Sequence, residues 1–304
     1  MLFSVVIPTY NRASLLSETL ESVWRQTFTD FEVIVVDDGS SDKTLEYLAS
    51  LGNKVCVLTQ KNLGPGAARN RGAKEAVGDY LAFLDSDDVW FPWTLATFVE
   101  VITKCGWPDF ISAKMQLFVS DSELNSVRQE PLAVETLPNY YEASDSRYYV
   151  SANMMVVRKS AFQNVDGFID KKIYAEDCDL SLRLGLAKGF VQILSPVTLG
   201  YRQHPTSARH DHRLILEGIG NLIESEQCGR YPGGQARELD RLRLITLHSR
   251  PASIDSLRGR RQKQGWRLYW KTFRWHLKMA RWKYLLGFPL MAMVCALGFR
   301  RVEQ

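Results

Sequence analysis

The sequence predicts an α/β protein with a mostly parallel central sheet flanked by helices, followed by a C-terminal helical extension. Short apolar segments alternate with segments of helical periodicity through residues 3–85, a pattern typical of βαβ units. Polar residues directly follow several of the apolar segments, as expected where parallel strands end at one edge of a sheet. Residues 213–304 are strongly basic and mostly helical in pattern.

The first predicted strand, residues 3–8, is apolar throughout, as a parallel strand buried on both faces should be. A predicted helix follows at residues 11–27, where Leu16, Leu20 and Val23 share one face. Trp24 is expected on the same face. Together these two segments indicate the first βα unit.

The next units repeat this order. Residues 31–38 form a second apolar segment, and the helix predicted at 40–52 begins with capping residues and ends at Gly52. A third strand at 54–59, a glycine-opened helix at 64–78 and a fourth strand at 79–85 complete the series. Right-handed crossovers between such strands predict a parallel sheet.

The pattern loosens after residue 88. Residues 120–147 are polar, contain two prolines and have no clear period, so we expect a loop or flap there. The remaining predictions are helices at 91–104 and 175–189 and strands at 109–119, 148–159 and within 190–204.

Charge divides the chain into two parts. Residues 1–212 carry 20 Lys/Arg and 27 Asp/Glu (net −7), whereas residues 213–304 carry 18 and 7 (net +11). We therefore predict an α/β domain at 1–212 and a basic helical region at 213–304, with a break near 228–234. Such a basic region suits an anionic partner, either a membrane surface or nucleic acid.

The cysteines and the N-terminus indicate a cytoplasmic location. The five cysteines are scattered and include no C-x-x-C pair, so zinc and redox motifs are unsupported and a reducing compartment fits. The start, MLFSVVIPTYNR, has no basic region before its apolar run and is interpreted as a strand, not as a signal peptide.

Three of the first four predicted strands end in polar residues. These are Pro8-Thr9-Tyr10-Asn11, Asp37-Asp38-Gly39-Ser40 and Asp85-Ser86-Asp87-Asp88. Five carboxylates gathered there would repel one another unless a cation is bound. Asp85 and Asp87 offer oxygen ligands suited to Mg²⁺ or Mn²⁺, which would share its other positions with a diphosphate. The alternative is a solvated acidic turn that caps the next helix.

Asp37 and Asp38 are candidates to accept hydrogen bonds from the base or ribose of a nucleotide, although a simple helix-capping turn is the plainer interpretation. The segment NLGPGAARNRG (62–72) lacks both the P-loop and the dinucleotide glycine patterns. Arg69 in this segment is a candidate to neutralise the charge of a phosphate group on a bound nucleotide.

The ordered motifs VVIPTYNR, VVDDGSSD, N-x-G-x-x-x-A-R-N-x-G, YLAFLDSDD and AED resemble inverting family-2 glycosyltransferases of the GT-A fold over about residues 3–210. The resemblance implies that Thr9, Tyr10, Asp38 or Asp37, and Arg69 line the nucleotide pocket. It implies that Asp87 binds the metal. Pro8, Asn11, Asp85 and Ser86 belong to the same motifs and are assigned to the nucleotide-sugar site.

The resemblance also assigns the catalytic base to Asp177, with Glu176 beside it. The alternative is ordinary acidic charge at the start of a helix. His204 matches a histidine placed near the diphosphate or metal in some members, or is a structural histidine. Tyr148, Ser151, Asn153 and Met154 are expected near the acceptor, and Trp90 and Trp93 are expected either to stack on a sugar or to belong to the core.

The predicted function is inverting, metal-dependent transfer of a sugar from a nucleoside-diphosphate sugar, with UDP favoured, to a glycan or lipid-linked saccharide in surface polysaccharide or glycolipid synthesis. Two alternatives come from other classes: a non-catalytic nucleotide-sugar-binding protein, and a nucleic-acid-binding protein that uses its basic tail. The tail contains no nucleic-acid-binding motif.

The C-terminal tail predicts peripheral attachment at the inner face of the cell membrane. From Arg258 to Gln304 there are 12 Lys/Arg and one acidic residue. Within 266–284, aromatic and leucine side chains follow helical spacing beside basic ones. Residues 285–299 carry no charge but include Pro289, which favours shallow or re-entrant insertion over a full span. A helical pair packed on the catalytic domain, or an oligomer contact, is the alternative.

Overall fold

A computed structural model describes residues 1–146, 148, 150–169, 171–204, 211–259 and 261–296. The chain divides into two compact units. The first comprises Met1–Glu142, Tyr148–Lys172 and Glu176–His210, and the second Ala143–Arg147, Ile173–Ala175 and Asp211–Gln304. Two short segments that precede the expected boundary at residue 212 thus belong to the second unit.

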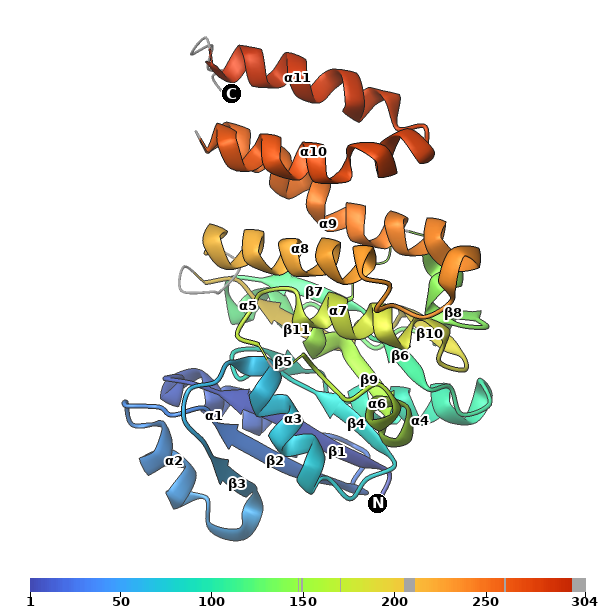
Figure 1. Ribbon diagram of the computed structural model, residues 1–304. Helices are drawn as coiled ribbons and strands as arrows, with labels where there is room; N and C mark the ends of the chain where they lie inside the picture. Colours follow the sequence, from blue (N-terminus) through green and yellow to red (C-terminus); the bar gives the residue numbers. More distant parts are fainter. Residues whose placement is uncertain (147, 149, 170, 205–210, 260, 297–304) are drawn as a thin grey trace. The chain divides into compact units, whose positions relative to one another are not determined.

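The first unit is built on an eight-stranded sheet of order β3-β2-β1-β4-β9-β6-β10-β8 (Figure 1). Strands β3, β2, β1 and β4 are mutually parallel, and so are β6 and β10, whereas β9 and β8 run antiparallel to their neighbours. The predicted mostly parallel α/β sheet is confirmed. Its strands are β1 (Phe3–Thr9), β2 (Phe31–Asp37), β3 (Cys56–Thr59), β4 (Tyr80–Phe83), β6 (Phe110–Ser112), β8 (Ala133–Leu137), β9 (Met155–Arg158) and β10 (Phe190–Ser195).

Helices α1 to α4 and α7 lie within the ranges predicted from sequence, whereas α5 and α6 were not predicted. The α-helices up to residue 183 are α1 (Ala13–Trp24), α2 (Thr44–Ser50), α3 (Pro65–Glu75), α4 (Thr94–Lys104), α5 (Asp121–Leu124), α6 (Lys159–Asn164) and α7 (Glu176–Arg183). Short 3-10 turns are η1 (Gly52–Lys54), η2 (Tyr140–Ala143), η3 (Ala152–Met154) and η4 (Leu184–Leu186).

Alternating side chains of β1 pack on opposite layers of helices. Ile7 belongs to one core cluster with Leu20 of α1 and Phe98 of α4. On the other face, α3 lies so close to the sheet that a Cβ added to Gly72 would stand 2.5 Å from Cγ1 of Val6. Only glycine permits this close approach. It brings the face of α3 that carries Gly72 against the ends of the strands.

Two sequence predictions are wrong between residues 109 and 147. The single strand expected at 109–119 is two strands in different sheets, because Ala113 bonds to Met154 while the carbonyl of Lys114 accepts from Thr198 and Leu199. The expected loop at 120–147 contains α5 and β8, and β8 forms the antiparallel edge of the large sheet beside β10. Residue 147 of that loop, and residue 149 of the strand expected at 148–159, lie outside the described residues.

A small second sheet completes the first unit. Its order is β5-β11-β7, formed by β5 (Val89–Trp90), β11 (Leu199–Arg202) and β7 (Met115–Phe118). Antiparallel pairing of β11 with β5 sets Gly200 opposite Val89. This pairing brings the chain after β11 beside the acidic turn that precedes β5.

The second unit confirms the predicted helical extension. Its elements are α8 (His212–Gln227), η6 (Gly234–Arg237), α9 (Glu238–Arg258), α10 (Gln262–Lys278) and α11 (Trp282–Ala296). The helical spacing expected to run unbroken through 266–284 is interrupted, because the chain turns between α10 and α11, where Ala280 has φ +51°. Within the described part of the chain, none of the helices combines the length and apolar character needed to cross a membrane.

Candidate functional site

The polar strand ends predicted from sequence lie at one edge of the large sheet. In the parallel register of β1 and β2, Thr9 is opposite Asp37. Strand β4 runs parallel on the other side of β1 and leads directly into Asp85. The carboxyl ends of these three strands therefore present their side chains together, where α/β sheets bind ligands.

Asn11 joins the ends of the first two strands. Its backbone N–H donates to Oγ of Ser40 at 2.9 Å, and its side-chain Oδ1 accepts from the N–H of Ser41 at 2.8 Å. The residue adopts φ +52°, a left-handed conformation that asparagine tolerates better than most residues. Tyr10, directly before it, keeps 45% of its surface exposed at the rim of the site.

Asp37 and Asp38 differ in how their oxygens are used. Asp38 accepts from Gln60 and from the N–H groups of Leu63 and Gly64, so both of its oxygens hold the following loop. Asp37 Oδ2 accepts from the backbone N–H of Ser40 at 3.0 Å, while its buried Oδ1 has no partner among the described residues. Of the two carboxylates, Asp37 has the oxygen to offer to a ligand.

Arg69 of α3 bridges two acidic groups. Its guanidinium bonds to Oδ1 of Asp85 at 2.5 Å and to Oε1 of Glu176 at 2.8 Å. The arginine is only 3% exposed, and its ring-face contact with Phe168 covers the guanidinium. In this arrangement Arg69 fixes the end of β4 against the start of α7.

The same bridge shifts the pKa values of the groups that form it. Burial raises the pKa of Glu176, and the Asp177 carboxylate adds to the rise, while Arg69 opposes it. Burial by itself would lower the pKa of Arg69, but the two carboxylates outweigh that effect and raise it. Arg69 therefore stays cationic, and its charge offsets acidic groups that would otherwise repel one another.

Asp177 stands at the first turn of α7 and is partly exposed. Its Oδ1 accepts from the backbone N–H of Cys178 at 2.7 Å, and burial raises the pKa of its carboxyl. The preceding Ala175 has φ +67°, a strained conformation for alanine of the kind found at functional sites. Asp179, two residues further along α7, is buried and pairs with Arg183.

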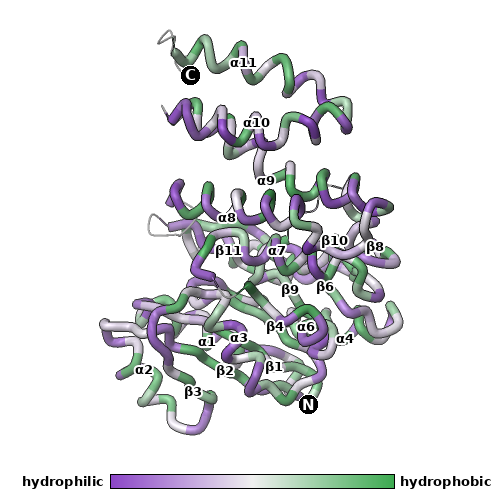
Figure 2. Tube along the Cα trace, viewed as in Figure 1, coloured by the Kyte–Doolittle hydropathy of each residue, from purple (hydrophilic) through white to green (hydrophobic). Residues whose placement is uncertain are grey.

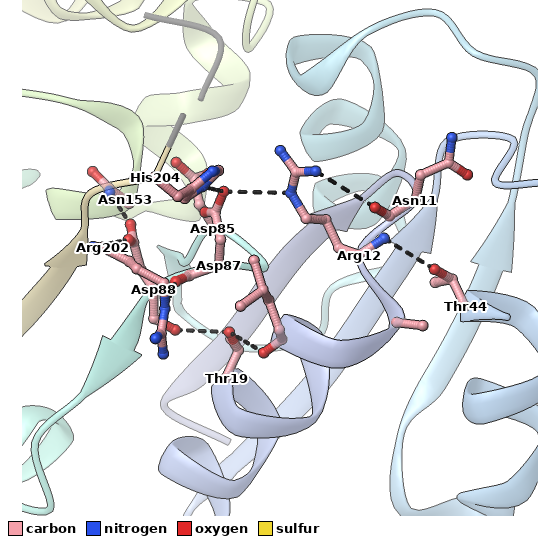
Figure 3. A network of polar contacts seen from close by, with 12 residues as sticks. Asn11, Arg12, Thr19, Thr44, Asp85, Asp87, Asp88, Asn153, Arg202 and His204 are labelled. Atoms are coloured by element: carbon pink, nitrogen blue, oxygen red, sulfur yellow. Dashed lines mark hydrogen bonds and ion pairs between the residues drawn. The ribbon is translucent and has the colours of Figure 1, made fainter. Parts of the chain in front are cut away.

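Asp87 and His204 form the candidate metal site. Oδ2 of Asp87 lies 2.9 Å from Nε2 of His204, and Nε of Arg12 lies 3.6 Å from the same oxygen (Figure 3). Both the carboxylate and the imidazole keep some exposure. Carboxylate oxygen and imidazole nitrogen are donors that Mn²⁺ accepts, so the pair fits such an ion.

The protein would supply few ligands to this ion. Across the ranges that the structure describes, no group of three or more His, Cys, Asp and Glu side chains is arranged to hold a metal. Asp85, the other predicted ligand, has Oδ1 paired with Arg69. A site with one or two protein ligands suits a cation that takes its other positions from phosphate and water.

Sequence reasoning missed the network beneath this pair. Asp88 is 1% exposed and accepts from the backbone N–H of Arg202 at 2.9 Å and from the amide of Asn153 (Figure 3). Burial, with help from Asp87 and Asp85, raises the pKa of Asp88 well above its usual range. Arg202 also donates to the carbonyl of Asp87 at 3.0 Å, so the network fixes the backbone of the acidic turn.

Several other predicted residues are buried in supporting positions. Pro8 lies within β1, and Ser86 is buried in the acidic turn. Trp90 belongs to the core cluster, while Trp93 stacks on Phe91 and donates its Nε1–H to the carbonyl of Val197. Both tryptophans thus have structural partners.

Comparisons with known proteins agree with this architecture. Residues 4–165 match the sequence family described as Glycosyl transferase family 2. The succinoglycan biosynthesis protein ExoW of Rhizobium meliloti is 33% identical over 202 residues, which cover 59% of this chain and 63% of ExoW. An uncharacterised glycosyltransferase of Rickettsia prowazekii is 29% identical over 188 residues, covering 59% of this chain and 57% of that protein. The chain spans less than two thirds of the length of these relatives.

Solved structures share the fold. TarS 1–349 of S. aureus in complex with UDP aligns with a TM-score of 0.64 and 22% identity, covering 100% of this chain and 94% of that one. The mannosyltransferase PcManGT from Pyrobaculum calidifontis, in complex with GDP-Man and Mn²⁺, aligns with a TM-score of 0.54 and 17% identity over 97% of this chain and 86% of its own.

The Arg69 bridge yields a stability prediction. Replacing Arg69→Met leaves Asp85 and Glu176 without their buried cation, so the free energy of unfolding should fall by about 3–5 kcal/mol. Urea denaturation followed by fluorescence measures the change. The matched control Arg71→Met alters an exposed arginine two residues away and should stay within about 0.5 kcal/mol. Equal unfolding curves for the two variants would contradict the bridge.

Proposed function

The chain belongs to glycosyl transferase family 2, and from that membership we propose that it is an inverting, metal-dependent enzyme acting on a nucleoside-diphosphate sugar. UDP is the favoured nucleotide, and the acceptor is a glycan or lipid-linked saccharide in surface polysaccharide or glycolipid synthesis. The observation that carries the proposal is the Arg69 bridge. It joins the Asp85–Asp87 turn, suited to a cation, to the acidic start of α7, suited to a base.

The nucleotide half of the site is supported by two unpaired polar atoms. Oγ1 of Thr9 and Oδ1 of Asp37 are buried without hydrogen-bond partners in the described structure, and the two residues are opposite each other in the sheet. Leaving such atoms unpaired costs about 1–3 kcal/mol each. A base or ribose that bonds to them would recover this cost, and the exposed ring of Tyr10 is available for stacking.

The diphosphate half of the site rests on Asp87 and His204. A divalent cation bound there would offset the negative charge that the diphosphate gains as it leaves. Arg12, 3.6 Å from the Asp87 carboxylate, is a further cation within reach of phosphate oxygens. Its position at the end of the VVIPTYNR motif is the sequence signal that could have identified it.

The transfer step is assigned to Asp177. Its carboxylate removes the proton of the acceptor hydroxyl while that oxygen bonds to the anomeric carbon and the bond to the diphosphate breaks. A base is most effective when its pKa approaches the working pH, and burial raises the pKa of Asp177 in that direction. Glu176 is already bound to Arg69, which favours Asp177 as the group that contacts the acceptor.

The neighbours support the choice of substrates. TarS has been solved with UDP-GlcNAc, and PcManGT with GDP-Man and Mn²⁺, so nucleotide sugars and manganese suit this fold. ExoW acts in succinoglycan biosynthesis by its name, which supports an acceptor that is itself a saccharide.

The metal assignment predicts the behaviour of Asp87→Ala. Titration calorimetry of the wild type should show UDP binding that tightens when Mn²⁺ is added, and the variant should lose that dependence because it lacks a direct ligand. Glu75→Ala, which removes an exposed carboxylate at the end of α3, should behave as the wild type. Unchanged Mn²⁺-dependent affinity in Asp87→Ala would remove Asp87 from the metal site.

The base assignment predicts that Asp177→Asn binds the donor normally but loses transfer by about 10²- to 10⁴-fold in kcat. A donor panel assayed for released nucleoside diphosphate identifies the substrate and measures the loss. Near-normal turnover by Asp177→Asn would place the base elsewhere, and donor binding by the wild type without turnover on any acceptor would favour the non-catalytic alternative.

The pH dependence of kcat should also reflect the assignment of Asp177 as the base. A base works only when deprotonated, and a raised pKa moves protonation to higher pH. The kcat of the wild type should therefore fall on acidification at a pH above about 4, the ordinary aspartate range. An acidic limb at or below that range would contradict the environment described for Asp177.

A further inference from the structure

Helix α11 presents an apolar face to solvent. Its large exposed side chains recur at helical spacing, and each is 48% to 67% exposed: Trp282, Leu286, Leu290, Met293 and Val294. Such contiguous exposed apolar surface is uncommon on proteins that have no partner there.

The opposite face of the same helix is already buried. Leu285 and Phe288 pack in a cluster with Leu257 of α9 and Tyr269 of α10. Helix α11 is therefore apolar on nearly all sides, and Figure 2 draws it mostly green, whereas α10 carries purple stretches. A helix of this character needs a second apolar environment beyond the one that its neighbours provide.

Helix α10 presents a basic stripe beside it. The exposed positions that follow its helical period are Lys263, Arg267, Trp270, Arg274 and Lys278. Lys278 is paired with Glu238 of α9. Arg267 and Arg274 have no ion-pair partner among the described residues, and residues 261–296 contain eight Lys/Arg and no Asp or Glu.

Aromatic rings connect the two surfaces. Trp266 contacts Phe288 of α11, with ring centroids 5.2 Å apart, and stacks on Trp270 of the basic stripe at 6.0 Å. Trp270 itself is 62% exposed. Tryptophan with basic side chains beside an apolar face is the composition of helices that lie in the headgroup layer of a membrane.

We propose that the α10–α11 hairpin binds the surface of an anionic bilayer. The exposed face of α11 enters the boundary between headgroups and acyl chains, and the basic stripe of α10 contacts lipid phosphates. A second copy of this chain is the poorer occupant, because it would bring the same uncompensated cations against these ones. The structure describes 15 residues of α11, and their exposed apolar face beside the basic stripe suits a hairpin that lies on the membrane surface. Residues 297–299 of the apolar segment predicted from sequence lie outside the described residues.

Co-flotation of the full chain with vesicles tests the proposal. The protein should float with vesicles that contain phosphatidylglycerol, bind phosphatidylcholine vesicles much more weakly, and be released from the anionic ones as salt is raised. The double variant Arg267→Gln/Arg274→Gln should bind the anionic vesicles about 25-fold more weakly, because each cation near the surface contributes about a fivefold factor. The matched control Lys74→Gln/Lys188→Gln changes two exposed lysines of the first unit and should bind as the wild type.

A second pair of variants tests the apolar face. Leu286→Glu should abolish flotation, whereas Val119→Glu, which alters an equally exposed side chain of the first unit, should leave it unchanged. Far-ultraviolet circular dichroism and release of nucleoside diphosphate from a soluble acceptor reaction should be normal in both. This readout separates the membrane proposal from the proposed function, since each can fail alone.

Three results would overturn the membrane proposal. The full chain could fail to float with either vesicle, Leu286→Glu could float as well as Val119→Glu, or sedimentation could show a stable dimer that Leu286→Glu dissociates without any change in vesicle binding. If the chain bound RNA tightly and did not bind vesicles, the basic stripe would be assigned to nucleic-acid binding instead.

Discussion

Arg69 lies buried between Asp85, 16 residues away in the sequence, and Glu176, 107 residues away. Each carboxylate belongs to a different half of the candidate site, one to the acidic turn after β4 and the other to the start of α7. A buried cation so placed must be paired, since an unpaired charge in this position would cost several kcal/mol. The pairing therefore fixes the position of the acidic turn relative to the start of α7, where the candidate base lies.

The packing of α3 makes that bridge possible. Gly72 lets the helix approach β1 so closely that no Cβ would fit beside Val6, and Arg69 lies one turn earlier on the same helix. On the other side, Asp88, Asn153 and Arg202 hold the backbone of the acidic turn. The partly exposed carboxylate of Asp87 is thus held by a hydrogen-bonded frame, which is what a preorganised ligand site requires.

The local features of the first unit could be predicted from sequence. The apolar strands of the first half, the helices between them and the polar residues at strand ends follow from short-range patterns. The edge strand β8 could not be predicted, because it is only half-buried and has no apolar run. The ion-pair partners of Arg69 could not be predicted either. The sequence suggested that this arginine binds a phosphate group, whereas in the fold it pairs with Glu176 from a distant segment. Similarly, packing of Phe273 against the core of the second unit leaves the apolar face expected along 266–284 only partly exposed, whereas the uncharged segment that follows supplies the exposed apolar face of α11.

The central claim is that Asp87 and His204 hold a metal-bound nucleotide at this edge of the sheet. Pulsed electron paramagnetic resonance of Mn²⁺ added with UDP to the full chain tests it most directly. We predict nitrogen modulation from one imidazole together with phosphorus coupling from the diphosphate, and loss of the nitrogen signal in His204→Ala. A spectrum identical to that of Mn²⁺ and UDP without protein would contradict it.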